Sequence, residues 1–301
     1  MVGLSGGADS LALAAACAFE APRANLRAGA VIIDHGLQAN SAEVSRIAAE
    51  QAREFGLDPV IVERVSVGEE GGPEAAARSA RYAAFRRIRE TTGAQRILLA
   101  HTLDDQAETV LLGLARGSGP TSLSGMSADT GEFMRPFLGV RRAMTRAFCS
   151  DSGLTFWDDP HNDDPRYTRV RVRNRILPLL ESELGPGIAD ALARTAQLLR
   201  EDDEALNSLA LEWAEELVSQ DDSGAVRLDV RSLANDPAAI RQRIVRLVVL
   251  NEFGVSLSSA HTRAIMERVT QWHGQGPLDL PGVRVIRQAG YLLFSPPPDE
   301  A

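Results

Sequence analysis

Lysine is missing from this 301-residue chain, in which all 32 basic residues are arginine. A biased genomic composition is the simplest cause of that absence. It still has a functional consequence, because a Walker A P-loop needs its lysine on the phosphates of the nucleotide. The sequence therefore excludes that class of nucleotide hydrolases.

Cysteine is scarce as well, since only Cys17 and Cys149 occur, far apart in the sequence. They provide no disulfide framework, no zinc-ligand cluster and no Cys-x-x-Cys redox pair. A reducing cytoplasm fits this usage best. No stretch approaches the 18 apolar residues of a membrane span, and the apolar run at residues 11–19 lacks a preceding basic region. We therefore expect neither a membrane partner nor a signal peptide.

The chain is acidic overall, with a formal net charge of −9. Such a protein does not coat nucleic acid indiscriminately, although a local basic patch can still grip RNA. Its 44% apolar and 24% charged residues are ordinary for a globular protein. The length suggests two domains.

Short apolar runs alternate with amphipathic segments in the first half of the chain. The pattern predicts strands at residues 28–34, 60–67 and 96–100, and helices at about 40–55, 73–92 and 104–116. This alternation indicates βαβ units and a doubly wound parallel α/β sheet, with ligands beyond the carboxyl ends of the strands.

The second half changes character after Gly117. It contains a loop rich in Gly, Ser and Pro, a helix near 140–150, and one or two long helices over about 187–219. The block at about 224–295 mixes two more helices with short strands. We predict a catalytic domain at 1–185, a helical linker at 186–222 and a small α+β C-terminal domain at 223–301.

The strongest local signal is the loop Ser5-Gly6-Gly7-Ala8-Asp9-Ser10, between a short apolar start and a helical run. Its glycines allow a tight turn, and successive N–H groups at a helix N-terminus form an anion nest. Ser5 and Ser10 add hydroxyl donors. Asp9 would repel phosphate unless a divalent cation lies between them. The alternative is a capped helix start after a glycine turn. Because only four residues precede the loop, we expect a short first strand and a start that was trimmed or mis-assigned.

Two acidic constellations follow predicted strands. Asp34 and His35 end the second strand and should lie on the crevice, unless they serve only the turn. Asp105 and Glu108 open a helix and share one face of it. They could simply favour the helix dipole. Beside a phosphate cradle, paired carboxylates instead suggest a bound cation, either a metal or the ammonium group of an amino acid.

Arginines gather at two places. Arg78 and Arg81 lie on neighbouring turns of one predicted helix, where they either form a solvated face or stabilise phosphate or carboxylate groups. Five arginines occur within residues 166–175, a solvated stripe or a contact for RNA phosphates.

Together these segments resemble the tRNA(Ile)-lysidine synthetases, N-type ATP pyrophosphatases with a PP-loop, over most of the chain. The segments are SGGADS, DHGLQANSAE, EAAARSARY, LAHTLDDQAETVLLGLARGSGPTSLSGM, RPFLGVRR, GLTFWDDPHNDD and an end-of-domain motif at 169–181. The resemblance implies a Rossmann-like, adenine nucleotide alpha hydrolase-like fold. Two positions depart from the family pattern: Val170 replaces an Asn, and Gln38 replaces an Arg.

The resemblance also implies the reaction. ATP adenylates the C2 carbonyl oxygen of the wobble cytidine in a tRNA(Ile) with a CAU anticodon, and the ε-amine of L-lysine then displaces AMP. The implied cofactors are ATP and Mg²⁺, and a second copy of the chain is a candidate partner. The site residues assigned on this basis are Ser5, Gly6, Gly7, Ala8, Asp9, Ser10, Asp34 and His35 for ATP, with Asp9 also for the metal; Asp105 and Glu108 for lysine; Asp9, Arg78, Arg81 and Arg173 for catalysis; and Arg169, Arg171 and Arg173 for tRNA.

Three alternatives remain open at this stage. A tRNA thiolase would use the same loop, but it typically needs catalytic or cluster-holding cysteines. An ATP pyrophosphatase that amidates metabolites would leave the arginine-rich segment unexplained. A non-catalytic RNA-binding module would release no pyrophosphate.

Overall fold

The computed structural model describes residues 1–36, 40–66, 68, 72–117, 119–220 and 225–297, with only the backbone described at 73 and 74. The chain divides into two compact units, residues 1–200 and 201–301. Gln38 lies outside the described residues.

Unit 1 is built on a five-stranded sheet in the order β3-β2-β1-β4-β5, and all its strand pairs are parallel. The strands are β1 (Val2–Gly3), β2 (Ala30–Asp34), β3 (Val60–Arg64), β4 (Ile97–Leu98) and β5 (Phe133–Met134). The predicted doubly wound parallel sheet is confirmed. β5 was not predicted, because two residues are too few to display a period in the sequence.

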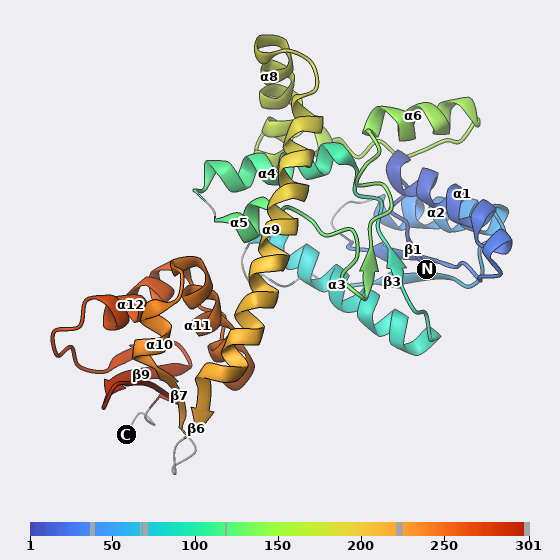
Figure 1. Ribbon diagram of the computed structural model, residues 1–301. Coiled ribbons are helices and arrows are strands. Elements are labelled where there is room, and N and C mark those ends of the chain that lie inside the picture. The colour runs from blue at the N-terminus through green and yellow to red at the C-terminus, as the bar shows by residue number, and fades with distance from the viewer. Residues whose placement is uncertain (37–39, 67, 69–71, 118, 221–224, 298–301) are drawn as a thin grey trace. The chain divides into compact units, whose positions relative to one another are not determined.

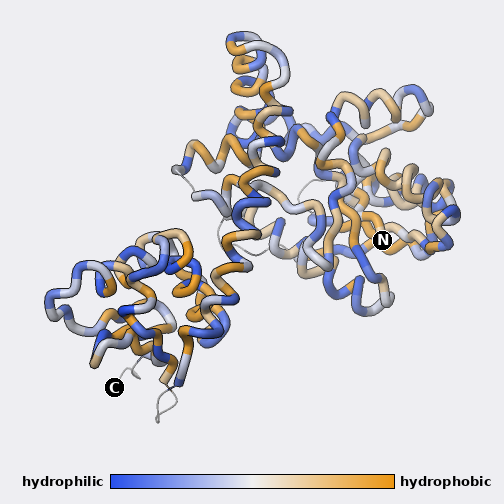
Figure 2. The backbone as a smooth tube through the Cα atoms, viewed as in Figure 1, coloured by the Kyte–Doolittle hydropathy of each residue, from blue (hydrophilic) through white to orange (hydrophobic). Residues whose placement is uncertain are grey.

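The helices of unit 1 surround its sheet (Figures 1 and 2). Alternate residues of β2 (Ala30–Asp34) join different hydrophobic cores. Ala30 and Ile32 join the core formed with α1 (Ala8–Glu20) and α2 (Ser41–Glu54). Val31 joins the core under α3 (Pro73–Thr92). This alternation follows from the two-residue period of a strand. It leaves the carboxyl ends of the strands free to form a site.

The arginine-rich segment is helical. It forms α7 (Thr168–Arg171), the π-helical turn η3 (Val172–Ile176) and the start of α8 (Leu177–Leu184). Val170 is buried, and Val172 and Leu177 pack against α4 (Leu103–Ala115). The other helices of unit 1 are η1 (Pro22–Ala24), α5 (Pro120–Leu123), α6 (Arg142–Asp151) and η2 (Pro160–Asp163).

The predicted long helical stretch is one helix, α9 (Ile188–Leu217). Ala189, near its start, packs in unit 1, and Ala210 packs in the core of unit 2. Unit 2 contains an antiparallel sheet in the order β6-β7-β10-β9-β8. Its elements are β6 (Val218–Gln220), β7 (Val226–Asp229), α10 (Val230–Asn235), α11 (Ala238–Phe253), α12 (Ser259–Thr270), β8 (Leu278–Leu280), β9 (Val283–Gln288) and β10 (Tyr291–Ser295).

Unit 2 confirms the predicted α+β class. It has three helices after α9 in its described part, where two were expected, because the six-residue α10 is too short to show helical periodicity. In the described part of the chain, no helix is long and apolar enough to cross a membrane.

Candidate active site

The loop between β1 and α1 turns at a residue that must be glycine. Gly6 has a φ of +84°, and a Cβ there would lie 3.2 Å from Cγ1 of Val44. Both the left-handed backbone and the close neighbour disfavour a side chain. The carbonyl of Gly6 accepts a 2.8 Å hydrogen bond from the N–H of Trp157, which ties the loop to a distant segment.

Two serines hold the loop in shape. The N–H of Ser5 donates to Oγ of Ser10 (3.1 Å), and Oγ of Ser10 donates to the carbonyl of Gly7 (2.9 Å). Gly7 is the N-cap of α1 and supplies no side chain to the first-turn amides. Those amides carry the positive end of the helix dipole, so the loop can bind an anion.

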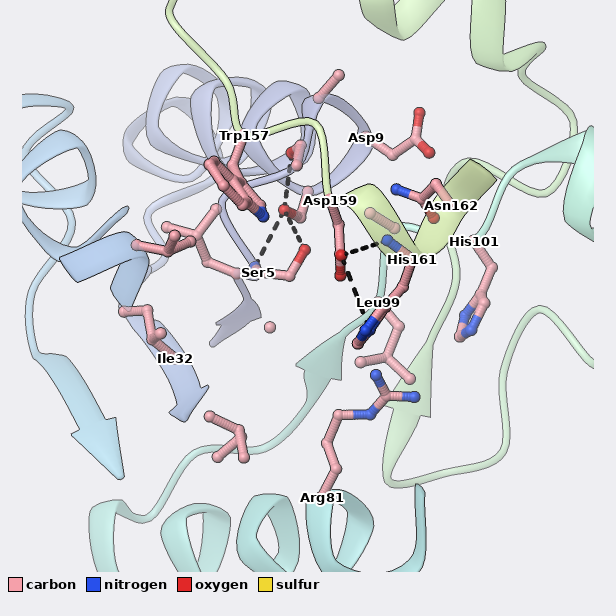
Figure 3. Close-up of a pocket in the computed structure, with 18 of the residues that line it drawn as sticks. Ser5, Asp9, Ile32, Arg81, Leu99, His101, Trp157, Asp159, His161 and Asn162 are labelled. Carbon is pink, nitrogen blue, oxygen red and sulfur yellow. Dashed lines mark hydrogen bonds and ion pairs between the residues drawn. The ribbon is translucent and has the colours of Figure 1, made fainter. Parts of the chain in front are cut away.

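The loop opens into a cavity of about 820 Å³. Figure 3 shows Trp157 and Ser5 on one side of it, with Arg81 pointing into it from α3. Ten of the residues predicted from the sequence line this cavity: Ser5, Gly7, Ala8, Asp9, Ser10, Asp34, His35, Arg81, Asp105 and Arg173. Five others do not: Gly6, Arg78, Glu108, Arg169 and Arg171. The carboxyl ends of β1, β2 and β4 therefore meet at one site, as the topology requires.

Asp34 and His35 follow β2 at the cavity wall. Burial alone would raise the pKa of Asp34, but the hydrogen bond from Gly36 N–H (2.9 Å), another from Ser41 and the charge of Arg64 lower that pKa. Burial and the charge of Arg81 lower the pKa of His35. At neutral pH the wall thus carries a carboxylate beside a neutral imidazole.

Asp9 extends from the first turn of α1 into the cavity (Figure 3). One carboxylate oxygen accepts a hydrogen bond from Thr145, and the other lies 3.5 Å from Nε of Arg142. Burial raises the pKa of Asp9. Among the described residues, no group of three or more His, Cys, Asp or Glu is placed to hold a metal. A cation at Asp9 would take further oxygen ligands from water or from a bound phosphate.

Asp105 and Glu108 belong to an acid–arginine cluster with Arg142, Arg169 and Arg173. Glu108 is fully buried and accepts hydrogen bonds from Arg142 (3.2 Å), Arg169 (2.7 Å) and Arg173 (2.7 Å). Asp105 lies 2.7 Å from Nη2 of Arg142. Burial alone would raise the pKa of Asp105, but the charges of Arg142 and Arg169 and hydrogen bonds from Thr102 lower it. These pairings were not predicted.

The helical path of residues 168–176 explains the cluster. Arg169 and Arg173 are four residues apart, so both reach Glu108 from one side of the helix. Arg171 turns away and donates to the carbonyls of Pro165 (2.7 Å) and Arg166 (2.9 Å). In this structure the three arginines expected to contact tRNA are engaged within the protein.

Several cavity residues received no role from the sequence. Arg142 comes from α6. Trp157 and Asp159 come from the loop that follows α6, and His161 comes from the short helix η2 after it (Figure 3). The segments RPFLGVRR and GLTFWDDPHNDD contain these residues and were noticed only for their resemblance. The concentration of Trp, His and acidic residues in one irregular segment is the sequence feature that could have marked it as functional.

Comparison with known proteins defines the class and then the family. The family model for the PP-loop domain matches residues 1–180, and that for the TilS substrate binding domain matches residues 228–293. The chain is therefore a PP-loop protein. It is 70% identical over 296 residues to a tRNA(Ile)-lysidine synthase of Leifsonia xyli subsp. xyli, covering 98% of this chain and 89% of that protein, and 51% identical over 298 residues to one of Thermobifida fusca, covering 98% and 91%. The chain belongs to the tRNA(Ile)-lysidine synthase family.

A solved structure shares the fold at much lower identity. The U34-tRNA thiolase NcsA from Methanococcus maripaludis, which holds a 4Fe–4S cluster, has a TM-score of 0.54 over 66% of this chain and 71% of that chain, at 18% identity. At this identity the likeness concerns the fold alone. In the present chain Cys17 lies half-buried on α1 and Cys149 is buried on α6.

Proposed function

We propose that this protein uses ATP to join L-lysine to C2 of the wobble cytidine of a tRNA(Ile) with a CAU anticodon, giving lysidine. The observation that carries the proposal is the PP-loop, with its left-handed Gly6 and uncapped helix N-terminus, opening into a cavity of about 820 Å³ that Asp9, Asp34 and Arg81 line. Family membership supports the same reaction.

In this proposal, ATP lies along the loop with its phosphates against the first-turn amides of α1 and the hydroxyls of Ser5 and Ser10. Asp34 and His35 contact the nucleoside part. Asp9 would hold Mg²⁺, and that ion would supply positive charge to offset the negative charge of the pyrophosphate. The placement of Asp9 in the cavity, within the same first turn of α1 that carries the uncapped amides, supports this role.

Each step balances. The C2 carbonyl oxygen of cytidine bonds to the α-phosphorus of ATP, and pyrophosphate leaves with the electron pair of the broken P–O bond. The lysine amine then bonds to C2, AMP leaves with the adenylated oxygen, and the amine loses a proton. Arg78, Arg81 and Arg173 are proposed to stabilise the developing negative charge.

We assign lysine to Asp105, whose carboxylate lines the cavity. Glu108 does not line it and is fully buried behind three guanidinium groups. Its proposed role toward lysine is therefore exerted through Arg142, Arg169 and Arg173, unless binding displaces one of them. The amine of lysine carries the same charge as a guanidinium, so the substrate can replace an arginine on Asp105 without leaving the acid unpaired.

The proposed tRNA contacts come from two regions. The small C-terminal domain, predicted at 223–301, includes the residues that match the TilS substrate binding domain. Arg169, Arg171 and Arg173 are the other candidates, and each would have to exchange an internal partner for RNA. A homodimer stays a prediction.

The decisive experiment is incorporation of radiolabelled lysine into unmodified tRNA(Ile) bearing CAU, with and without ATP. We expect ATP-dependent incorporation and release of AMP and pyrophosphate in equal amounts. ADP and orthophosphate as the main nucleotide products would overturn the proposal. Sulfur transfer to the RNA in place of lysine would favour the thiolase alternative. Pyrophosphate release that needs no RNA would favour a metabolite-amidating enzyme.

A further inference from the structure

A second pocket adjoins the cavity, and of its lining residues only Arg78 has a proposed role in the reaction described above. It has a volume of about 350 Å³ and is lined by Arg78, Ser79, Tyr82, Arg86 and Arg135. Tyr82 also lines the large cavity, so this side chain forms the boundary between the two spaces. Among its lining residues the pocket has three guanidinium groups and no carboxylate.

Arg135, just after β5, is 7% exposed. It donates to the carbonyl of Ser127 (2.8 Å) and to the hydroxyl of Tyr82 (3.4 Å), while its Nε has no hydrogen-bond partner in the described structure. No described carboxylate forms an ion pair with it. A buried cation without a counterion is costly, so this position favours an anionic ligand.

Arg78 faces the same hydroxyl from α3. Its Nη2 lies 3.3 Å from the oxygen of Tyr82 and its Cζ lies 4.8 Å from the centroid of that ring. Arg78 is exposed and has no described carboxylate partner. Two other arginines of α3 differ, because Arg87 pairs with Glu63 and Arg89 with Glu132. Arg86, which lines the pocket, also pairs with Glu132 (3.0 Å), so the pocket cations without a described carboxylate partner are Arg78 and Arg135.

We propose that Arg78, Arg135 and the hydroxyl of Tyr82 form a subsite for a backbone phosphate of the RNA strand whose nucleotide enters the cavity. The inference rests on the proposed function. The hydroxyl accepts hydrogen bonds from both arginines and keeps its own proton to donate to a phosphate oxygen. The exposure of Arg78 and Arg86 places the subsite where a strand can cross the rim, whereas ATP phosphates are accounted for by the PP-loop.

The test is filter binding of tRNA(Ile) across a salt series, without ATP or lysine, by the full chain and by R78Q and R87Q. Arg87 lies on the same helix, carries the same charge and lines neither pocket. We expect R78Q to bind roughly tenfold more weakly at low salt, with the log–log salt slope reduced by about one, while R87Q keeps the wild-type slope. Y82F, which keeps the ring packed against Phe133, should weaken binding without changing the slope.

Other outcomes overturn the inference. Equal changes in R78Q and R87Q would show a general effect of charge. If R78Q binds RNA as the wild type does but has a raised KM for ATP, the pocket holds a nucleotide phosphate. If only the KM for lysine rises, the pocket holds the carboxylate of the amino acid. Because binding is measured apart from lysine transfer, an Arg78-dependent slope in a protein that transfers no lysine would keep the subsite and overturn the proposed function.

Discussion

At the scale of single residues, Asp105 and Glu108 differ although they share one face of α4. Asp105 lines the cavity, whereas Glu108 is fully buried beneath three arginines. Both carry a charge that needs a partner in a dehydrated place. Only Asp105 can exchange that partner with a molecule in the cavity, so the two acids should respond differently to substitution.

Asp105→Asn should weaken the use of lysine and spare that of ATP. Losing one charge-assisted hydrogen bond costs about 1.5–3 kcal/mol, roughly a 10- to 150-fold rise in the KM for lysine. Steady-state kinetics in each substrate provide the measurement. Asp104→Asn is the matched control, because Asp104 lies in the same turn, pairs with Arg141 (3.2 Å) and does not line the cavity. Unchanged lysine kinetics with a raised KM for ATP would assign Asp105 to the metal site.

His101 is a second residue whose surroundings decide its chemistry. Burial lowers its pKa to about 4, opposed by Asp105 and assisted by Arg135, Arg169 and Arg78. Its Nδ1 has no hydrogen-bond partner among the described residues. The imidazole is therefore neutral at pH 7.

The pKa of His101 predicts a loss of stability in mild acid. Because the pKa is lower in the folded state than the usual 6.5, the unfolded chain binds more protons, and stability falls as the pH drops from 6.5 toward 4. We expect this residue to cost about 2 kcal/mol at pH 5 and almost nothing at pH 7.5. Urea unfolding at both values should show that His101→Gln loses less stability than the wild type. An equal loss in both proteins would mean that His101 titrates normally.

At the scale of elements, the turn from β1 into α1 combines a backbone requirement with a function. Gly6 is left-handed, a Cβ on it would lie 3.2 Å from Cγ1 of Val44, and the amides that follow it are the proposed phosphate site. Gly56, after α2, has a nearly identical φ of +83° but no neighbour within 4 Å of its virtual Cβ. Comparing a substitution at Gly6 with the same substitution at Gly56 therefore distinguishes the cost of backbone strain from the effect of distorting the loop.

Gly6→Ala should lose both stability and ATP binding, whereas Gly56→Ala should lose stability alone. The left-handed conformation costs a residue with a Cβ about 1–2 kcal/mol, which both variants share. Only Gly6→Ala adds the contact with Val44 and shifts the amides of α1. Equilibrium binding of ATP and thermal unfolding of both variants provide the comparison. Equal ATP affinity in the two variants would show that this loop does not bind the phosphates of ATP.

At the scale of the whole molecule, the two units have separate hydrophobic cores. The core of unit 2 is centred on residues such as Leu228, Ile244 and Phe294, and the proposed ATP site lies within unit 1. A ligand that binds only the folded form of one unit stabilises that unit.

We therefore expect two calorimetric unfolding transitions, of which ATP shifts one. At one hundred times its Kd, ATP should raise the transition of unit 1 by about 5–10 °C. Fluorescence assigns the transitions, because Trp157 lies in unit 1 while Trp213 and Trp272 lie in unit 2. A single transition that moves as a whole would show that the units unfold together.

The sequence by itself determined most of the longer elements of unit 1 and the edge of the sheet at which the cavity lies. Hydrophobic periodicity and the helix start signal at Pro73 predicted the helix at 73–92, which α3 (Pro73–Thr92) matches at both ends. Parallel strands bring their carboxyl ends to one edge of the sheet, so the sequence predicted that Ser5, Asp34 and Asp105 lie at the same site, and all three line the cavity. These inferences depend on local patterns and on a general rule of topology.

Only the tertiary structure decided which charges pair. Arg142 and Asp105 are 37 residues apart in sequence, and Arg169 and Glu108 are 61 apart. No local pattern records such partners, because an arginine facing solvent and one facing a buried acid have the same helical spacing. Of the arginines predicted to contact RNA, Arg169 and Arg173 thus lie against an internal carboxylate, and Arg135, which has no described carboxylate partner, lies in a stretch that showed no periodicity. Long-range packing determines the dielectric surroundings and the neighbours of each charge, and these determine its chemistry.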